Sequence, residues 1–149
     1  MSRWKATGSA GVIFVLVLVF AAVIIAAEMP AVIEMKTPYE KTRGVVTFSH
    51  QKHIDDYKLG CGECHHDDKG QPLTDLKPSD PVKKCFECHS KPGEIKGKEA
   101  RALSPKEKRA FHANAVHDNC IDCHRQFNKG KKDKPAPQTC KACHGGSDE

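Results

Sequence analysis

The sequence predicts a mainly irregular and α-helical chain with a short β hairpin near the N-terminus, folded around something other than its own side chains. Residues 28–149 contain only five Val, four Ile, four Leu and four Phe. These make up about 14% of the segment. A chain with less than roughly 20% of these residues is usually disordered. Another 18 positions are Gly or Pro, which interrupt long helices and strands. The composition therefore excludes an enzyme domain built on its own hydrophobic core.

The first segment of the chain has the pattern of an export signal. Arg3 and Lys5 precede an apolar run from Ala10 to Ala27, which ends in small residues. We therefore expect residues 1–27 to be a signal peptide and residues 28–149 to be the mature domain. The alternative is a retained inner-membrane anchor, because roughly 18 apolar residues are the lower limit for spanning a bilayer. Both put the domain in the periplasm, where eight cysteines would ordinarily indicate disulfides.

The cysteine spacing indicates a different role. All eight cysteines fall into pairs separated by two residues, and a histidine follows each pair at once. The four motifs are Cys61-Gly62-Glu63-Cys64-His65, Cys85-Phe86-Glu87-Cys88-His89, Cys120-Ile121-Asp122-Cys123-His124 and Cys140-Lys141-Ala142-Cys143-His144. Cysteine pairs alone would suit zinc ribbons, but chance places four histidines here with a probability on the order of 1 in 100,000. Cys-x-x-Cys-His is the attachment motif of c-type haem, so we predict four covalently attached haem c groups with their iron.

Haem also resolves the problem posed by the composition. The two thiols of each motif bond to one porphyrin, and the adjoining histidine becomes an axial ligand of its iron. These proximal ligands are His65, His89, His124 and His144. Four flat macrocycles bring the apolar surface that the side chains lack. We therefore expect the haems to be the core and the chain to fold only once they are attached.

Each iron has a second axial position, and five histidines remain to fill the four positions. They are His50, His53, His66, His112 and His117. Methionine is the usual alternative and raises the reduction potential, but after the signal segment only Met29 and Met35 exist, both upstream of the motifs. We therefore expect histidine on both faces of every haem, and low potentials. Because His65 and His66 are adjacent, they cannot bind the same iron, so His66 serves a neighbouring haem.

Two local patterns bear on where these histidines lie. A β-branched run before His50 predicts a short strand, and Ser104-Pro105-Lys106-Glu107 is a capping box with Pro at the first helical position. The box predicts one helix over residues 104–118. His112 and His117 are about 140° apart around such a helix, and we choose His117 as the ligand because it is close to the third motif. His112 is then expected at the surface or at a haem edge.

The pattern resembles that of the class III cytochromes c, the tetrahaem cytochromes c3 and their trihaem relatives. The matching features are Phe48-x-His50-x-x-His53, Cys61-Gly-Glu-Cys64-His65-His66, the three later Cys-x-x-Cys-His motifs and Phe111-His112-Ala-Asn-Ala-Val-His117-Asp118. They cover residues 39–144. The resemblance implies a small cytochrome c3-like multihaem fold in which every iron has two histidine ligands. It pairs His50 with His65, His66 with His89, His53 with His124 and His117 with His144.

Two spacings depart from the family pattern. Several members have four residues between the cysteines at two of their sites, whereas all four motifs here have two. Only two residues separate His117 from Cys120, a spacing nearer to the trihaem type.

Charge is unevenly distributed along the chain. Residues 28–80 carry 7 basic and 10 acidic side chains, while residues 81–141 carry 15 basic and 7 acidic ones. Four lysines lie between the third and fourth motifs: Lys129, Lys131, Lys132 and Lys134. One interpretation is a solvated face; the other is a docking patch that steers an acidic redox partner to the fourth haem, as in the resembled family. Few aromatic residues interleave the lysines, so nucleic acid is a poor alternative. Residues 90–103 are expected to be an exposed linking loop.

These observations favour a periplasmic electron-transfer protein, a single small domain around four haems. The resemblance implies that it shuttles electrons at low potential among partners such as hydrogenase, formate dehydrogenase and membrane-bound redox complexes. Catalysis is not expected, because two filled axial positions leave no vacant site on any iron. Two alternatives stay open: a membrane-anchored multihaem quinol dehydrogenase subunit that keeps the apolar segment, and an enzyme with one five-coordinate haem. A membrane contact is expected only if the N-terminal segment is retained.

Overall fold

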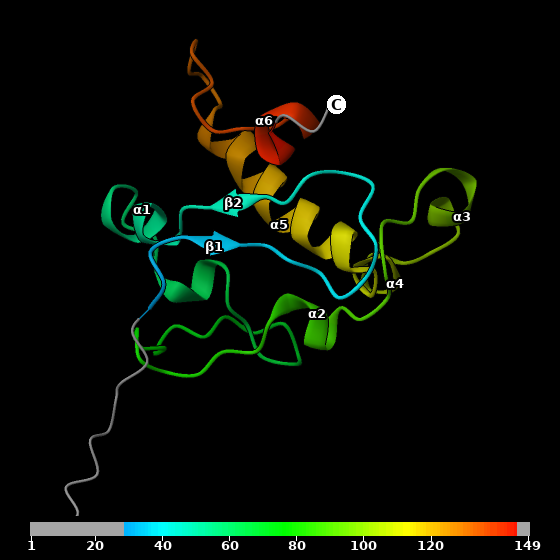
Figure 1. Cartoon of the computed structure of the whole chain (residues 1–149), viewed down its shortest axis with the longest axis horizontal. Coiled ribbons are helices and arrows are strands. Elements are labelled where there is room, and N and C mark those ends of the chain that lie inside the picture. The colour runs from blue at the N-terminus through cyan, green and yellow to red at the C-terminus, as the bar shows by residue number, and fades with distance from the viewer. Residues whose placement is uncertain (1–28, 146–149) are drawn as a thin grey trace, which may run out of the picture.

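The computed structural model of the chain describes residues 29–145, so the predicted signal segment lies outside the described residues. Short elements joined by long irregular segments make up the described part (Figure 1). In chain order they are β1 (Ile33–Glu34), β2 (Thr47–Phe48), α1 (His50–Asp55), the 3-10 turn η1 (Cys61–Glu63), α2 (Cys85–Cys88), α3 (Gly97–Arg101), α4 (Pro105–Arg109), α5 (His112–Phe127) and α6 (Cys140–His144). The predicted fold class, mainly irregular and helical with an N-terminal hairpin, is confirmed.

The two strands form an antiparallel hairpin that leads directly into the first histidines. In its register Ile33 pairs with Phe48 and Glu34 with Thr47. The amide of Gln51 in α1 donates to the carbonyl of Ala31 at 3.0 Å, which ties α1 to the chain before β1. The strand predicted before His50 is therefore present, and it places α1, with His50 and His53, at one end of the hairpin (Figure 1).

Helix α5 is the longest described element, and other elements are arranged along it. Helices α2 and α4 pack against α5, and α6 lies near its C-terminal end (Figure 1). The helix contains the whole third motif and ends at Phe127, well beyond the end that the sequence predicted. His117 and His124 are consequently about two turns apart and on the same side of α5. One helix thus carries two of the proposed iron ligands.

The single helix predicted from Ser104 onward is wrong, because the segment forms two helices, α4 and α5. The start is as predicted: the Ser104 hydroxyl accepts from the Glu107 amide at 3.3 Å, and the Glu107 carboxylate accepts from the Ser104 amide at 2.8 Å. The break is at Phe111, whose backbone is extended (φ −81°, ψ 126°). There the amide of His112 donates to the carbonyl of Lys91 at 2.8 Å. A bond to a distant segment thus replaces the continuation of the helix.

The segment 90–103 is more ordered than the exposed linking loop that the sequence predicted. It contains α3, and Asn114 of α5 holds it: Oδ1 accepts from the Ile95 amide at 2.8 Å and Nδ2 donates to the Ile95 carbonyl at 3.3 Å. Asn128, just after α5, holds the following loop in the same way. Its Oδ1 accepts from the Ala136 amide at 3.1 Å and its Nδ2 donates to the Ala136 carbonyl at 2.8 Å.

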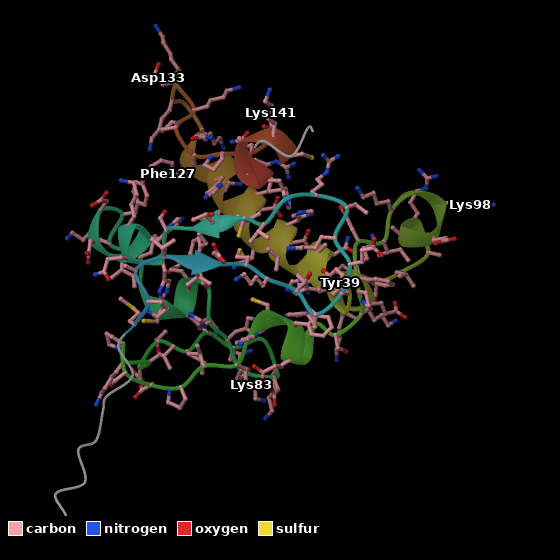
Figure 2. All side chains as sticks on the ribbon, in the orientation of Figure 1. Tyr39, Lys83, Lys98, Phe127, Asp133 and Lys141 are labelled. Atoms are coloured by element: carbon pink, nitrogen blue, oxygen red, sulfur yellow. The ribbon has the colours of Figure 1, made fainter. Side chains whose placement is uncertain are left out.

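The elements are not held together by a protein hydrophobic core. Within residues 29–145 no hydrophobic side chain is buried, and the two buried residues are His112, 9% exposed, and Asn128, 4% exposed. Charged side chains such as Lys98 and Lys141 extend away from the ribbon (Figure 2). A domain of this size ordinarily buries most of its large apolar side chains. The structure therefore agrees with the composition, which predicted that the side chains alone do not form a hydrophobic core.

No helix in the described part of the chain combines the length and the hydrophobicity needed to cross a membrane.

Candidate haem-binding sites

The structure brings the eight predicted histidine ligands together in four pairs, numbered here by their motif. The distances between ring centroids are 6.3 Å for His50 and His65, 5.8 Å for His66 and His89, 6.2 Å for His53 and His124, and 6.3 Å for His117 and His144. Each pair joins a motif histidine to a histidine from another part of the chain. The pairs are those that the resemblance implies, while iron ligation itself stays a prediction.

The spacing within the pairs suits a metal between two imidazoles. An imidazole nitrogen binds a transition metal at about 2 Å, and rings on opposite sides of one metal then have centroids about 6.3 Å apart. The four observed distances, 5.8–6.3 Å, lie within about half an ångström of that value. The chain therefore positions each pair as two axial ligands of one iron would be positioned.

In six of the eight rings Nδ1 donates to a backbone carbonyl oxygen. The acceptors are Pro30 for His50 (3.2 Å), Ser49 for His53 (2.9 Å), Asp67 for His66 (2.8 Å), Arg109 for His89 (2.5 Å), Pro137 for His124 (2.6 Å) and Gly44 for His144 (2.9 Å). A bond of this kind fixes the tautomer and the orientation of a metal-binding histidine. In these six rings it leaves Nε2 unprotonated and available to bind a metal.

His117 has a carboxylate in the place of the carbonyl. Its Nδ1 lies 3.6 Å from Oε1 of Glu94, which belongs to the segment docked on α5. A carboxylate beside the outer nitrogen of a ligating imidazole orients the ring and increases its basicity. Glu94 is therefore a supporting residue that the sequence did not indicate, because no local pattern brings the segment 90–103 to this helix.

His112 lies in an aromatic environment instead of facing a second ligand. A hydrogen bond of 2.8 Å joins its Nδ1 to the Tyr39 hydroxyl, and the rings of Tyr39 and Phe86 lie 5.8 and 5.6 Å from its own. Of the two positions expected for His112, the surface one is wrong, because these two side chains from distant segments cover it. The position at a haem edge stays a prediction. Burial, with smaller effects of His89 and His117, lowers its pKa, so the imidazole is neutral at pH 7.

A comparison with models of protein families identifies the family of the chain. The sequence model of the class III cytochrome c family matches residues 25–144, most of the chain. The chain belongs to the class III cytochrome c family. It is similar to "Cytochrome c3, 26 kDa" of Desulfomicrobium norvegicum (strain DSM 1741 / NCIMB 8310), with 29% identity over 110 residues, 71% of this chain and 82% of that protein. No solved structure matches it.

Class III cytochromes carry covalently attached c-type haem, and the residues of this chain fit that group. All eight motif cysteines are free of disulfides. In residues 29–145 no three His, Cys, Asp or Glu side chains gather as a metal cluster; the histidines meet in twos. Two protein ligands are what a porphyrin-bound iron takes, because the macrocycle supplies the others. The chain is accordingly a multihaem electron carrier, and members of its family are carriers rather than enzymes.

Burial disfavours the thiolate form at four of the motif cysteines of this cytochrome: Cys64, Cys85, Cys120 and Cys143. Burial raises the pKa of the half-buried Cys120 to about 11, and it raises the pKa of Cys143 in the same direction. Zinc binds thiolates, so a thiol that resists deprotonation weakens its binding. Thioether formation with haem leaves no charge on the buried sulfur.

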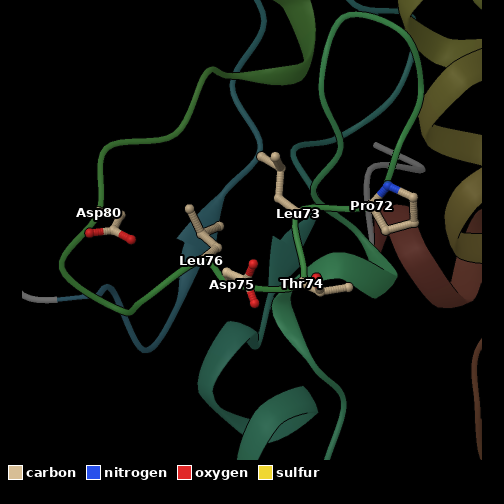
Figure 3. Close-up of a pocket in the computed structure, with 6 residues that line it drawn as sticks. All are labelled: Pro72, Leu73, Thr74, Asp75, Leu76 and Asp80. Carbon is tan, nitrogen blue, oxygen red and sulfur yellow. The ribbon is translucent and has the colours of Figure 1, made fainter.

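A pocket of about 330 Å³ lies along residues 72–80 of the cytochrome, beside the first motif (Figure 3). Its lining residues are Pro72, Leu73, Thr74, Asp75, Leu76 and Asp80. Gly62 of the first motif packs against this segment, since a Cβ there would lie 3.2 Å from Cβ of Pro72 and 3.3 Å from the carbonyl carbon of Leu73. Leu73 and Leu76, both half-buried, extend on the same side of the segment (Figure 3). These two side chains therefore place apolar surface beside the first motif.

Aromatic residues around the histidines were not among the residues that the sequence predicted. Tyr39 and Phe86 cover His112, while Tyr57 and Phe127 contact each other near the third pair. Their positions in the sequence could have indicated them. Every aromatic residue after the signal segment except Tyr39 lies within four positions of a motif or a candidate histidine: Phe48, Tyr57, Phe86, Phe111 and Phe127.

Proposed function

We propose that this class III cytochrome is a periplasmic, low-potential electron carrier with four bis-histidine c-type haems. The observation that supports the proposal best is the set of four imidazole pairs, each 5.8–6.3 Å between centroids and each with one motif histidine. Iron held by two histidines in a covalently attached haem cycles between the ferric and ferrous states and so carries one electron. The eight motif cysteines anchor the haems, and the eight paired histidines ligate them.

The residues around the proposed ligands favour a low reduction potential. All eight are histidines, whereas methionine, which raises the potential, occurs after the signal segment only as Met29 and Met35. Carbonyl oxygens accept from Nδ1 of six rings, and the Glu94 carboxylate lies beside Nδ1 of His117. These groups make the imidazoles better electron donors and so stabilise the oxidised metal. Filled axial positions also exclude a bound substrate, which favours a carrier over an enzyme.

A lysine loop between α5 and α6 is the surface that we propose for docking. It comprises residues 129–134, with four lysines and Asp133. The loop projects beyond α5 and α6 (Figure 1), with Asp133 near its tip (Figure 2), and the bonds of Asn128 to Ala136 fix its base. Concentrated positive charge attracts acidic partners over long distances and speeds docking. Donors of the hydrogenase or formate dehydrogenase type and membrane-bound redox complexes are the partners proposed.

Haem counting with a potentiometric titration tests the proposed function. The protein is exported from a host that matures c-type cytochromes, haem is counted per chain, and visible spectra are recorded while the potential is varied. We expect four haems per chain, low-spin iron in both redox states and reversible titration at low potential. A high-spin fraction would support the enzyme with one five-coordinate haem. A compact, colourless protein with zinc or disulfides at the thiols would overturn the proposal.

The location of the protein is tested by fractionation and by the mass of its N-terminus. We expect cleavage near residue 27 and recovery from the periplasmic fraction. Recovery from membranes with the apolar segment attached would favour the quinol dehydrogenase subunit instead.

A further inference from the structure

The four imidazole pairs differ in the angle between their ring planes. The planes of His53 and His124, the third pair, are 24° apart. In the first, second and fourth pairs the planes cross at 79°, 64° and 89°. One pair is therefore close to parallel, while the other three are closer to perpendicular.

The ring of His53 is held from several directions. Phe48 of β2 lies 4.7 Å from it and Tyr57, just after α1, lies 5.7 Å from it, both measured between centroids. Its Nδ1 donates to the Ser49 carbonyl at 2.9 Å. These contacts define the plane of the His53 ring.

The same tyrosine reaches the helix that carries the other ligand of the pair. The rings of Tyr57 and Phe127 meet edge to face, with centroids 5.4 Å apart and planes at 68°. Phe127 ends α5, about one turn after His124. The Lys131 ammonium lies 3.1 Å from the centroid of Phe127, a cation–π contact that keeps this ring in place. The contact of Tyr57 with Phe127 therefore links the segment of His53 to the helix of His124.

We propose that Tyr57 and Phe127 are positioning residues, and that their contact, the Tyr57–Phe127 clasp, holds the His53 and His124 rings nearly parallel. The inference rests on the proposed function, because it takes both histidines as ligands of the third haem. Each axial imidazole interacts through its π system with the iron d orbital perpendicular to its plane. Parallel rings act on one orbital and separate it from its partner, whereas perpendicular rings act on both alike. The clasp thus gives the third haem an electronic structure unlike that of the other three.

The electron paramagnetic resonance spectrum of the fully oxidised holoprotein reports this difference directly. Parallel rings give a rhombic low-spin ferric signal, and perpendicular rings give a strongly anisotropic signal with a large maximum g value. We expect one rhombic signal and three strongly anisotropic signals, with integrated intensities in the ratio of one to three.

Three variants test whether the Tyr57–Phe127 clasp is responsible for the rhombic signal. Tyr57→Leu and Phe127→Leu each remove one ring, so we expect the rhombic signal to move to a larger maximum g value and one of the four potentials to shift. The matched control, Tyr57→Phe, keeps the ring and should keep the wild-type spectrum and potentials. If Tyr57→Leu fails to mature, Phe127→Leu tests the same contact from α5.

The proposal of the clasp is overturned if the leucine variants leave the rhombic signal unchanged, if they alter all four signals alike, or if Tyr57→Phe has the same effect as Tyr57→Leu. Four low-spin haems with a single type of signal would also overturn it while leaving the proposed function standing. Fewer than four haems per chain would instead count against the proposed function.

Discussion

A histidine binds a metal only when one ring nitrogen is unprotonated and points at the metal, and here the backbone selects that nitrogen. The carbonyls that accept from Nδ1 lie far away in the sequence for several rings: Pro30 serves His50, and Gly44 serves His144. The proposed axial geometry therefore depends on the completed fold, since the supporting groups come from other segments. The tautomers of four of the ligands therefore depend on distant parts of the chain: His50, His89, His124 and His144.

Replacing His117 with Met tests which histidine completes the fourth pair. A thioether ligand raises the reduction potential of haem iron, so we expect one of the four potentials to rise while the other three change little. A potentiometric titration followed by visible spectra measures this. His112→Gln is the control and should leave all four haems low-spin. High-spin iron in His112→Gln, with normal potentials in His117→Met, would reverse the assignment.

Replacing Tyr39 with Phe tests the hydrogen bond that buries His112. The change leaves Nδ1 of a residue that is only 9% exposed without its partner, which we expect to lower the free energy of unfolding by about 1–3 kcal/mol. Guanidinium unfolding of the haem-loaded protein measures the loss. Tyr57→Phe is the control, because the Tyr57 hydroxyl has no hydrogen-bond partner among the described residues. Equal losses in the two variants would contradict the assignment.

Among single residues, the sequence predicted those that haem attachment requires at a fixed spacing. It did not predict those whose position depends on packing against distant segments. Haem attachment requires a fixed spacing of two thiols and a histidine, so the four motifs can be recognised from the sequence alone. The burial of His112 follows from contacts with Tyr39 and Phe86, which are remote in the sequence. No local pattern carries that information.

Among the elements, helices α4 and α5 show why local signals predict the start of a helical segment better than its end. The capping box at Ser104 is satisfied within four residues and was predicted, because all its hydrogen bonds are local. The break at Phe111 arises from the bond between the His112 amide and the Lys91 carbonyl, a partner that the sequence does not place there. The extension of α5 through the third motif to Phe127 was not predicted either, since the expected helix ended at Asp118.

Replacing Asn114 with Ala tests how the segment 90–103 is attached to α5. The variant loses two hydrogen bonds to Ile95, each contributing about 0.5–1.5 kcal/mol. We expect faster hydrogen exchange at the Ile95 amide and faster proteolysis within the segment. Asn128→Ala is the matched control: it should release the lysine loop and leave the segment 90–103 protected. The same protease sensitivity in both variants would argue against separate attachment points.

For the molecule as a whole, the uneven charge predicts how partners approach. Lys129, Lys132 and Lys134 changed together to Glu should slow association with an acidic redox partner on the order of tenfold at low salt, and added salt should reduce the difference. Stopped-flow electron transfer measures the rate. Lys131 is left unchanged because it contacts Phe127. Lys98, Lys106 and Lys108 changed to Glu form the control with the same net charge, and an equal slowing there would show that total charge, not the lysine loop, steers docking.

The absence of a protein core among the described residues leads to the last prediction, that the chain does not fold without haem. Ordering each residue costs about 1–2 kcal/mol of conformational entropy, and no hydrophobic side chain within residues 29–145 is buried to offset it. Residues 28–149 with all eight motif cysteines changed to Ala should therefore show a coil-like circular dichroism spectrum, no cooperative thermal transition and unprotected amides. The haem-loaded protein is the reference and should show all three signs of order. A compact haem-free chain with a cooperative transition would mean that side chains alone supply the core.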